Sequence, residues 1–110
     1  MGGRIKTIEN ETVAAAVAIL REAAPDSKVV LFGSRARGQA RPDSDLDFLV
    51  VEPAVRSRRH EMARLTDLLR PLRIPVDVLV FSQAAFDKWS RIPGNVLHRA
   101  AEEGKVLYAG

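Results

Sequence analysis

The chain has 110 residues, of which 46% are hydrophobic and 28% are charged, and its formal net charge is +3. This length and composition exclude a disordered polypeptide and predict one domain over residues 1–110. No apolar run reaches the roughly 20 residues of a membrane span, and no apolar signal stretch opens the chain, so we expect a cytoplasmic protein without membrane contact. Since the chain has no cysteine, disulfides, thiolate nucleophiles and cysteine-ligated zinc are excluded.

Helices and strands alternate along the first half of the chain. Apolar residues at i, i+4 and i+7 predict a helix over residues 8–24, which Pro25 ends. A β-branched run predicts a strand over residues 28–32, and a second strand is expected over residues 45–51. A glycine-containing polar loop separates the two strands.

The same alternation continues in the second half. An apolar stripe predicts a helix over residues 55–70, and a strand is expected over residues 75–81. The last predicted elements are a helix capped by Ser82, a helix from Pro93 to Glu103 and an edge strand from Lys105 to Tyr108. The pattern predicts an α/β or α+β fold, in which helices pack on a small sheet.

Three aspartates interrupt the predicted strands. Asp45 and Asp47 are two residues apart at the start of a strand, so their side chains share one face of the sheet. Asp77 shares a face with Leu79 and Phe81 in an otherwise apolar strand. Two carboxylates about 5 Å apart repel by roughly 3 kcal/mol, so a cluster requires protons, arginines or a divalent cation. We favour the cation, because an all-oxygen site suits Mg²⁺ or Mn²⁺.

A tight turn, Gly33-Ser34-Arg35-Ala36-Arg37-Gly38, follows the first predicted strand. Gly33 permits close approach to the backbone, the Ser34 hydroxyl is a donor, and Arg37 can neutralise phosphate charge. The turn matches neither the Walker A motif nor the dinucleotide fingerprint. Combined with the three acids, it predicts phosphoryl or nucleotidyl transfer, which needs carboxylate-held metals beside donors for a polyphosphate.

This turn, followed by Ser44-Asp45-Leu46-Asp47, resembles the signature of the minimal nucleotidyltransferases of the DNA polymerase β superfamily. The resemblance extends to Asp77, at the place of the third metal-binding acid, and to the tail over residues 103–108. It implies the nucleotidyltransferase fold, a small mixed sheet backed by helices. It also implies two Mg²⁺ ions and ATP or another NTP as substrate.

The resemblance assigns roles to single residues. The implied metal ligands are Asp45, Asp47 and Asp77, and the implied nucleotide-binding residues are Gly33, Ser34 and Arg37. Asp77 would also help to deprotonate the acceptor hydroxyl. Arg37 would either contact phosphate or lock the loop, and both alternatives stay open.

The function that this resemblance implies is transfer of AMP from ATP to a hydroxyl acceptor. Minimal members of the family commonly pair with small helical HEPN-type proteins in toxin–antitoxin modules, so we expect such a partner and an antitoxin role. Because 110 residues hold little beyond the catalytic sheet, another subunit would supply the acceptor surface. The alternatives are a catalytically silent antitoxin that binds nucleotide and partner, and an enzyme that modifies a small hydroxylated antibiotic.

Nucleic-acid binding is the remaining alternative. Arg56, Arg58, Arg59 and His60 form a basic run at a predicted helix start, where a solvated face is the favoured interpretation. Aromatic residues are 5% of the chain, too few for an evident set of base-stacking platforms. The remaining assignments place Trp89, Phe86 and Met62 in the core and His98 on the surface.

Overall fold

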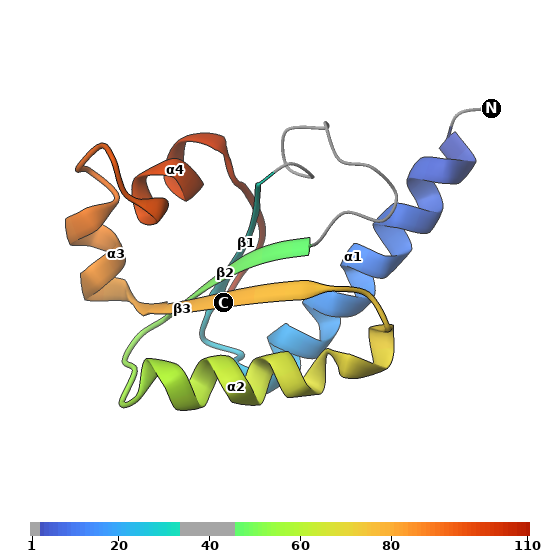
Figure 1. Ribbon diagram of the computed structural model, residues 1–110, viewed down its shortest axis with the longest axis horizontal. Helices are drawn as coiled ribbons and strands as arrows, with labels where there is room; N and C mark the ends of the chain where they lie inside the picture. The colour runs from blue at the N-terminus through green and yellow to red at the C-terminus, as the bar shows by residue number, and fades with distance from the viewer. Residues whose placement is uncertain (1–2, 34–45) are drawn as a thin grey trace.

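The computed structural model describes residues 3–33 and 46–110 and contains a mixed sheet of four strands (Figure 1). The elements are α1 (Gly3–Ala23), β1 (Lys28–Phe32), β2 (Leu46–Glu52), α2 (Arg58–Leu68), the 3₁₀ helix η1 (Arg70–Leu72), β3 (Val76–Ser82), α3 (Gln83–Trp89), α4 (Val96–Glu103) and β4 (Lys105–Ala109). The strand order is β3-β2-β1-β4, and only β2 and β3 run parallel. The predicted mixed sheet with packed helices is confirmed.

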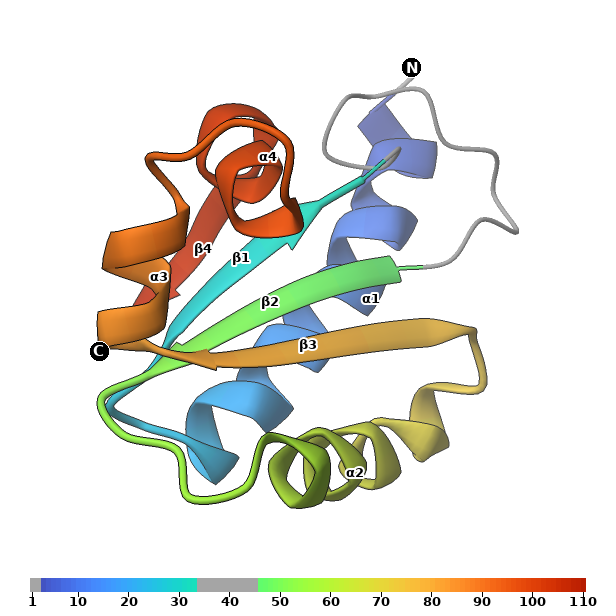
Figure 2. The same ribbon diagram turned by 60° about the vertical axis from the view of Figure 1, so that its left-hand side comes forward.

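Helices cover both faces of the sheet (Figures 1 and 2). On one face, Leu20 of α1 and Leu65 of α2 pack with Phe48 of β2 in the larger core. On the other face, Leu97 of α4 packs with Leu49 of β2 in a smaller core. Because the side chains of β2 alternate between the two faces of the sheet, this strand contributes to both apolar cores.

In the described part of the chain, no helix is both long and apolar enough to cross a membrane.

Three predicted helix starts are wrong. Helix α1 begins at Gly3 rather than at residue 8, and capping explains the other two differences. Helix α2 begins at Arg58 because the Ser57 side chain accepts a hydrogen bond from the N–H of His60. Helix α4 begins at Val96 rather than at Pro93, since the Asn95 side chain accepts from the first free N–H groups. Trp89, which was expected in the core, is 43% exposed.

Candidate functional site

Two aspartates lie side by side near the start of β2 and β3. In the parallel register of these strands, Asp47 is the Cα partner of Asp77. Register partners direct their side chains to the same face, and neighbouring strands lie about 4.8 Å apart. Asp47 is half-buried and Asp77 is exposed. The strands therefore bring these two predicted site residues together at the surface.

The acidic pair, Asp47 and Asp77, lies on the face of the sheet that α3 and α4 cover further along. Leu49 shares the face of Asp47 by alternation, and it packs with Leu97 of α4. In the neighbouring strand, Leu79 shares the face of Asp77 and packs against the same core. One face of two adjacent strands is thus acidic where the strands begin and apolar where the helices cover them.

Gly33 borders the carboxylate of Asp47. It follows Phe32, which is the β1 partner of Asp47, and its φ of 81° lies in the left-handed region. A Cβ atom on Gly33 would collide with Oδ2 of Asp47 and lie 3.2 Å from its Cγ. Both the backbone conformation and the space beside the carboxylate therefore require glycine. The group that approaches the backbone at Gly33 is thus the Asp47 carboxylate, and the approach of a phosphate to this turn stays a prediction.

Three of the predicted site residues, Ser34, Arg37 and Asp45, lie outside the described residues. Over residues 3–33 and 46–110, no three His, Asp or Glu side chains gather as candidate metal ligands. The acidic pair nevertheless fits Mg²⁺ in its donor chemistry, since two carboxylates on adjacent strands offer hard oxygen ligands. Asp45 is the residue from which a third carboxylate is expected.

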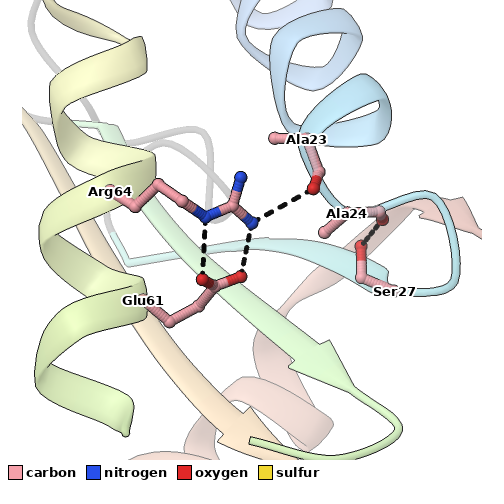
Figure 3. A network of polar contacts seen from close by, with 5 residues as sticks. All are labelled: Ala23, Ala24, Ser27, Glu61 and Arg64. Carbon is pink, nitrogen blue, oxygen red and sulfur yellow. Dashed lines mark hydrogen bonds and ion pairs between the residues drawn. The ribbon is translucent and has the colours of Figure 1, made fainter.

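A second acidic cluster, which the sequence analysis did not identify, joins the end of β2 to α2. The Arg64 guanidinium donates to both Glu61 oxygens, at 2.8 and 2.6 Å, and also to the carbonyl of Ala23 at 3.1 Å (Figure 3). Arg64 thereby links α2 to the C-terminal end of α1. The i, i+3 spacing of Glu61 and Arg64 was the available signal in the sequence.

Glu52 of β2 completes this cluster. Burial raises its pKa from 4.5 to about 7, and the neighbouring Glu61 carboxylate adds to the shift. The hydrogen bonds from Arg64 lower the pKa of Glu61 to about 2. Near neutral pH, Glu52 therefore holds a proton over much of the population while Glu61 stays ionised. Contact between Glu52 and Glu61 depends on the packing of β2 against α2, which no local sequence pattern reveals.

The arginines of the basic run at the start of α2 have different surroundings in the structure. Arg58 donates from Nε to the carbonyl of Val80 at 2.6 Å, and its guanidinium lies 3.9 Å from the centre of the Phe81 ring. Arg56 and Arg59 are exposed. At least one residue of the basic run, Arg58, thus makes contacts within the chain. His98, expected on the surface, is half-buried with Nδ1 2.8 Å from the carbonyl of Ser90.

Comparison with known proteins identifies the family of the chain. The family model of the nucleotidyltransferase domain matches residues 13–106. The chain belongs to the nucleotidyltransferase family. This nucleotidyltransferase is 33% identical over 81 residues to a Methanocaldococcus jannaschii protein named "Putative protein adenylyltransferase", and the match covers 74% of this chain and 77% of that protein. The predicted enzyme class, nucleotidyl transfer, is confirmed.

Solved structures share the fold. A toxin–antitoxin structure with AMP-PNP has a TM-score of 0.63 at 24% identity and covers 86% of this chain and 70% of its own. A complex of tri-AMPylated Shewanella oneidensis HEPN toxin with MNT antitoxin has a TM-score of 0.62 at 20% identity, covering 92% of this chain and 72% of its own. These structures confirm the fold that the resemblance implies, and the family model confirms the nucleotidyltransferase family.

Proposed function

We propose that this nucleotidyltransferase transfers AMP from ATP to a hydroxyl group of a partner protein, a HEPN-type toxin, for which it acts as the antitoxin. The observation that carries the proposal is the acidic pair of Asp47 and Asp77 beside the left-handed turn at Gly33. The name of the Methanocaldococcus relative and the AMPylated toxin in the Shewanella complex support adenylyl transfer to protein. We also propose that residues 1–110 form one nucleotidyltransferase domain.

The proposed reaction forms one bond and breaks another at the α-phosphorus. The acceptor oxygen bonds to this phosphorus while the bond to the β-phosphate oxygen breaks, so that pyrophosphate leaves. Asp77, as the more exposed acid of the pair, is assigned to accept the hydroxyl proton. Two Mg²⁺ ions held by Asp45, Asp47 and Asp77 would neutralise charge that develops on the phosphates.

The nucleotide is assigned to the turn that follows β1. The Asp47 carboxylate lies against Gly33, so a phosphate at this turn would lie next to the proposed metal ligands, and a side chain on Gly33 would displace that carboxylate. Ser34 and Arg37 are proposed to donate to the β- and γ-phosphates. The toxin–antitoxin structure with AMP-PNP supports an adenine nucleotide as the substrate.

The test is transfer of label from ATP labelled at the α-phosphate, in the presence of Mg²⁺ and the co-purified partner. We expect label on the partner with the unmodified chain and none with Asp47→Asn. Glu61→Gln is the matched control, because it also removes a carboxylate but lies in the second acidic cluster. Binding of ATP and partner without any transfer would support the silent antitoxin instead. Transfer to a small hydroxylated antibiotic, with no label on protein, would support the other alternative.

A further inference from the structure

The outer edge of β3 is an open strand edge next to the acidic pair. Within the described residues, β3 pairs with β2 alone. The N–H of Leu46 donates to the carbonyl of Pro75 at 3.0 Å, so the polar backbone groups of Pro75 and of every second residue after it face β2. The polar backbone groups of Val76, Val78 and Val80 consequently face outward. Such an edge is a template for another extended chain.

Arg58 occupies one end of this strand edge by hydrogen-bonding to its backbone. Its Nε donates to the carbonyl of Val80 at 2.6 Å, and its guanidinium stacks 3.9 Å from the ring centre of Phe81. The Val80 carbonyl is therefore already satisfied within the chain. The outward groups of Val76 and Val78 stay available, and they lie on either side of Asp77. The open part of the edge is thus centred on the proposed proton acceptor.

A groove of about 840 Å³ runs along the same edge. One wall is the face of α2 that carries His60, Ala63 and Asp67, residues spaced three or four apart, and Arg70 of η1 continues this wall. The other wall is the segment of β3 from Val76 to Val78. Figure 2 shows α2 running along the β3 side of the sheet. The groove provides space for the side chains of a strand added to this edge.

We propose that the acceptor hydroxyl reaches the site on an extended peptide segment that adds to β3 as a further, antiparallel strand. This inference rests on the proposed AMP transfer. In antiparallel pairing, the residue opposite Asp77 belongs to a non-hydrogen-bonded pair, whose Cα atoms are about 4.5 Å apart and whose side chains are close. Its side chain lies on the same face as Asp47 and Asp77. Its two neighbours in the added strand hydrogen-bond to Val76 and Val78.

This arrangement specifies the class of substrate. The acceptor is a serine, threonine or tyrosine in a segment that can extend, as opposed to a hydroxyl on a helix or a free alcohol. The oxygen of that residue bonds to the α-phosphorus of ATP, its proton passes to Asp77, and pyrophosphate leaves. Main-chain hydrogen bonds to the edge supply affinity, and the alternation of the strand selects which side chain faces the acids.

The first test compares Val76→Pro with Val76→Ala. Both variants replace the same half-buried side chain, but only proline removes the outward N–H, and edge strands tolerate proline. For Val76→Pro we expect kcat/KM toward the partner protein to fall about 10-fold relative to Val76→Ala. Transfer to N-acetyltyrosinamide and the KM for ATP should be equal in the two variants, which excludes a folding defect.

The outcomes separate the inference from the proposed function. Equal labelling of the partner by Val76→Pro and Val76→Ala overturns strand addition and leaves AMP transfer standing. If the unmodified chain labels neither the partner nor N-acetyltyrosinamide, the proposed function fails and strand addition fails with it.

A second test needs no variant of the protein. The probe is a seven-residue peptide of alternating valine and glutamine residues with tyrosine at its centre. Methylation of the backbone nitrogens of the two residues beside the tyrosine should lower its labelling about 10-fold, because these N–H groups face β3. Methylation of the tyrosine nitrogen, which faces away, should leave labelling unchanged. Equal sensitivity to the two modifications, or labelling no better than that of N-acetyltyrosinamide, would contradict strand addition.

Discussion

Strand β2 contributes one acid near each end to a pair of neighbouring acids, and the two pairs have different surroundings. At its end, Glu52 faces Glu61, and Arg64 forms a bidentate ion pair with Glu61. Near its start, Asp47 lies beside Asp77, with the left-handed Gly33 against the Asp47 carboxylate. Both pairs must offset repulsion between neighbouring carboxylates. The first does so with groups of the protein itself, an arginine and a retained proton.

We interpret the glutamate pair as structural, and we propose that the acidic pair of Asp47 and Asp77 binds ligands. Arg64 also donates to Ala23 of α1, so the glutamate cluster ties two helices to the sheet. Asp77 is exposed, and the Asp47 carboxylate lies in the space that the missing side chain of Gly33 leaves. We propose that the pair of Glu52 and Glu61 contributes to stability, whereas the pair of Asp47 and Asp77 at the surface takes up a cation and substrate. Variants of the two pairs should therefore separate activity from stability.

The largest expected difference is in activity. Asp77→Asn should lower AMP transfer about 10³-fold, because it removes a metal ligand and the proton acceptor. Its melting temperature should stay close to that of the unmodified chain, since the side chain is exposed. Glu61→Gln should show the reverse, with lower stability and transfer within about twofold. A Glu61→Gln variant as inactive as Asp77→Asn would remove the distinction between the two pairs.

Two glycines of the described residues have a left-handed backbone, and they test whether the space that Gly33 leaves for the Asp47 carboxylate matters. Gly33 and Gly94 have φ values of 81° and 97°, but a Cβ on Gly94 would meet nothing within 4 Å. Alanine at either position should cost about 1 kcal/mol of unfolding free energy through backbone strain. Only Gly33→Ala should also lower transfer, by about 10²-fold, by displacing the Asp47 carboxylate. Equal activity of the two variants would show that this space is not needed.

The next effect concerns the arginine of the glutamate cluster. Arg64→Ala should lower the free energy of unfolding by about 1.5 kcal/mol, because it removes charge-assisted hydrogen bonds to Glu61 and to Ala23. Arg59→Ala, at an exposed position of the same helix, is the control and should change it by less than about 0.5 kcal/mol. Urea denaturation measures both. Similar losses in the two variants would argue against the structural role of the Arg64 contacts.

The smallest expected effect is on how the free energy of unfolding depends on pH. The pKa of Glu52 rises from 4.5 to about 7 on folding, so between these values the folded state holds more protons than the unfolded chain. The free energy of unfolding should therefore fall as pH rises from 4.5 to about 7. Glu52→Gln keeps a hydrogen-bond donor without a titrating proton, and it should gain about 1 kcal/mol relative to the unmodified chain above this range.

The pKa of Glu61 shifts in the opposite direction to that of Glu52, which provides an internal check on the pH profile of stability. Its pKa is lowered from 4.5 to about 2, so its stabilising contribution is present above 4.5 and is lost as pH falls toward 2. Urea denaturation across pH should thus show a maximum near 4.5 in the unmodified chain. In Glu52→Gln, the decline on the alkaline side should be absent. An unchanged decline would assign it to another group.

Much of the fold could be predicted because local patterns determined it. The strand from Lys28 to Phe32 has the predicted bounds, and Ser82 caps α3 as expected through a hydrogen bond from the N–H of Ala85. The starts of α2 and α4 were predicted less accurately, at residue 55 and at Pro93. The side chains of Ser57 and Asn95 cap these helices, so the helices begin after them. Trp89 is exposed because its short helix packs through Phe86 instead.

The candidate site was only partly predictable, because it depends on contacts between elements that lie apart in the sequence. Sequence spacing indicates which acids share a face of one strand, but the adjacency of Asp47 and Asp77 depends on the register of β2 against β3. The contact of Glu52 with Glu61 likewise depends on how α2 packs on the sheet. The open edge of β3 depends on strand order, which a single strand pattern does not contain.

Binding of a divalent cation tests the central claim most directly. Mn²⁺ can replace Mg²⁺ at an oxygen site, and paramagnetic resonance counts the free ion. In the presence of AMP-PNP, we predict that Asp77→Asn weakens Mn²⁺ binding at least about 10-fold, whereas Glu61→Gln leaves it unchanged. Equal Mn²⁺ affinity in the unmodified chain, Asp77→Asn and Glu61→Gln would contradict the assignment of the acidic pair as the reactive site.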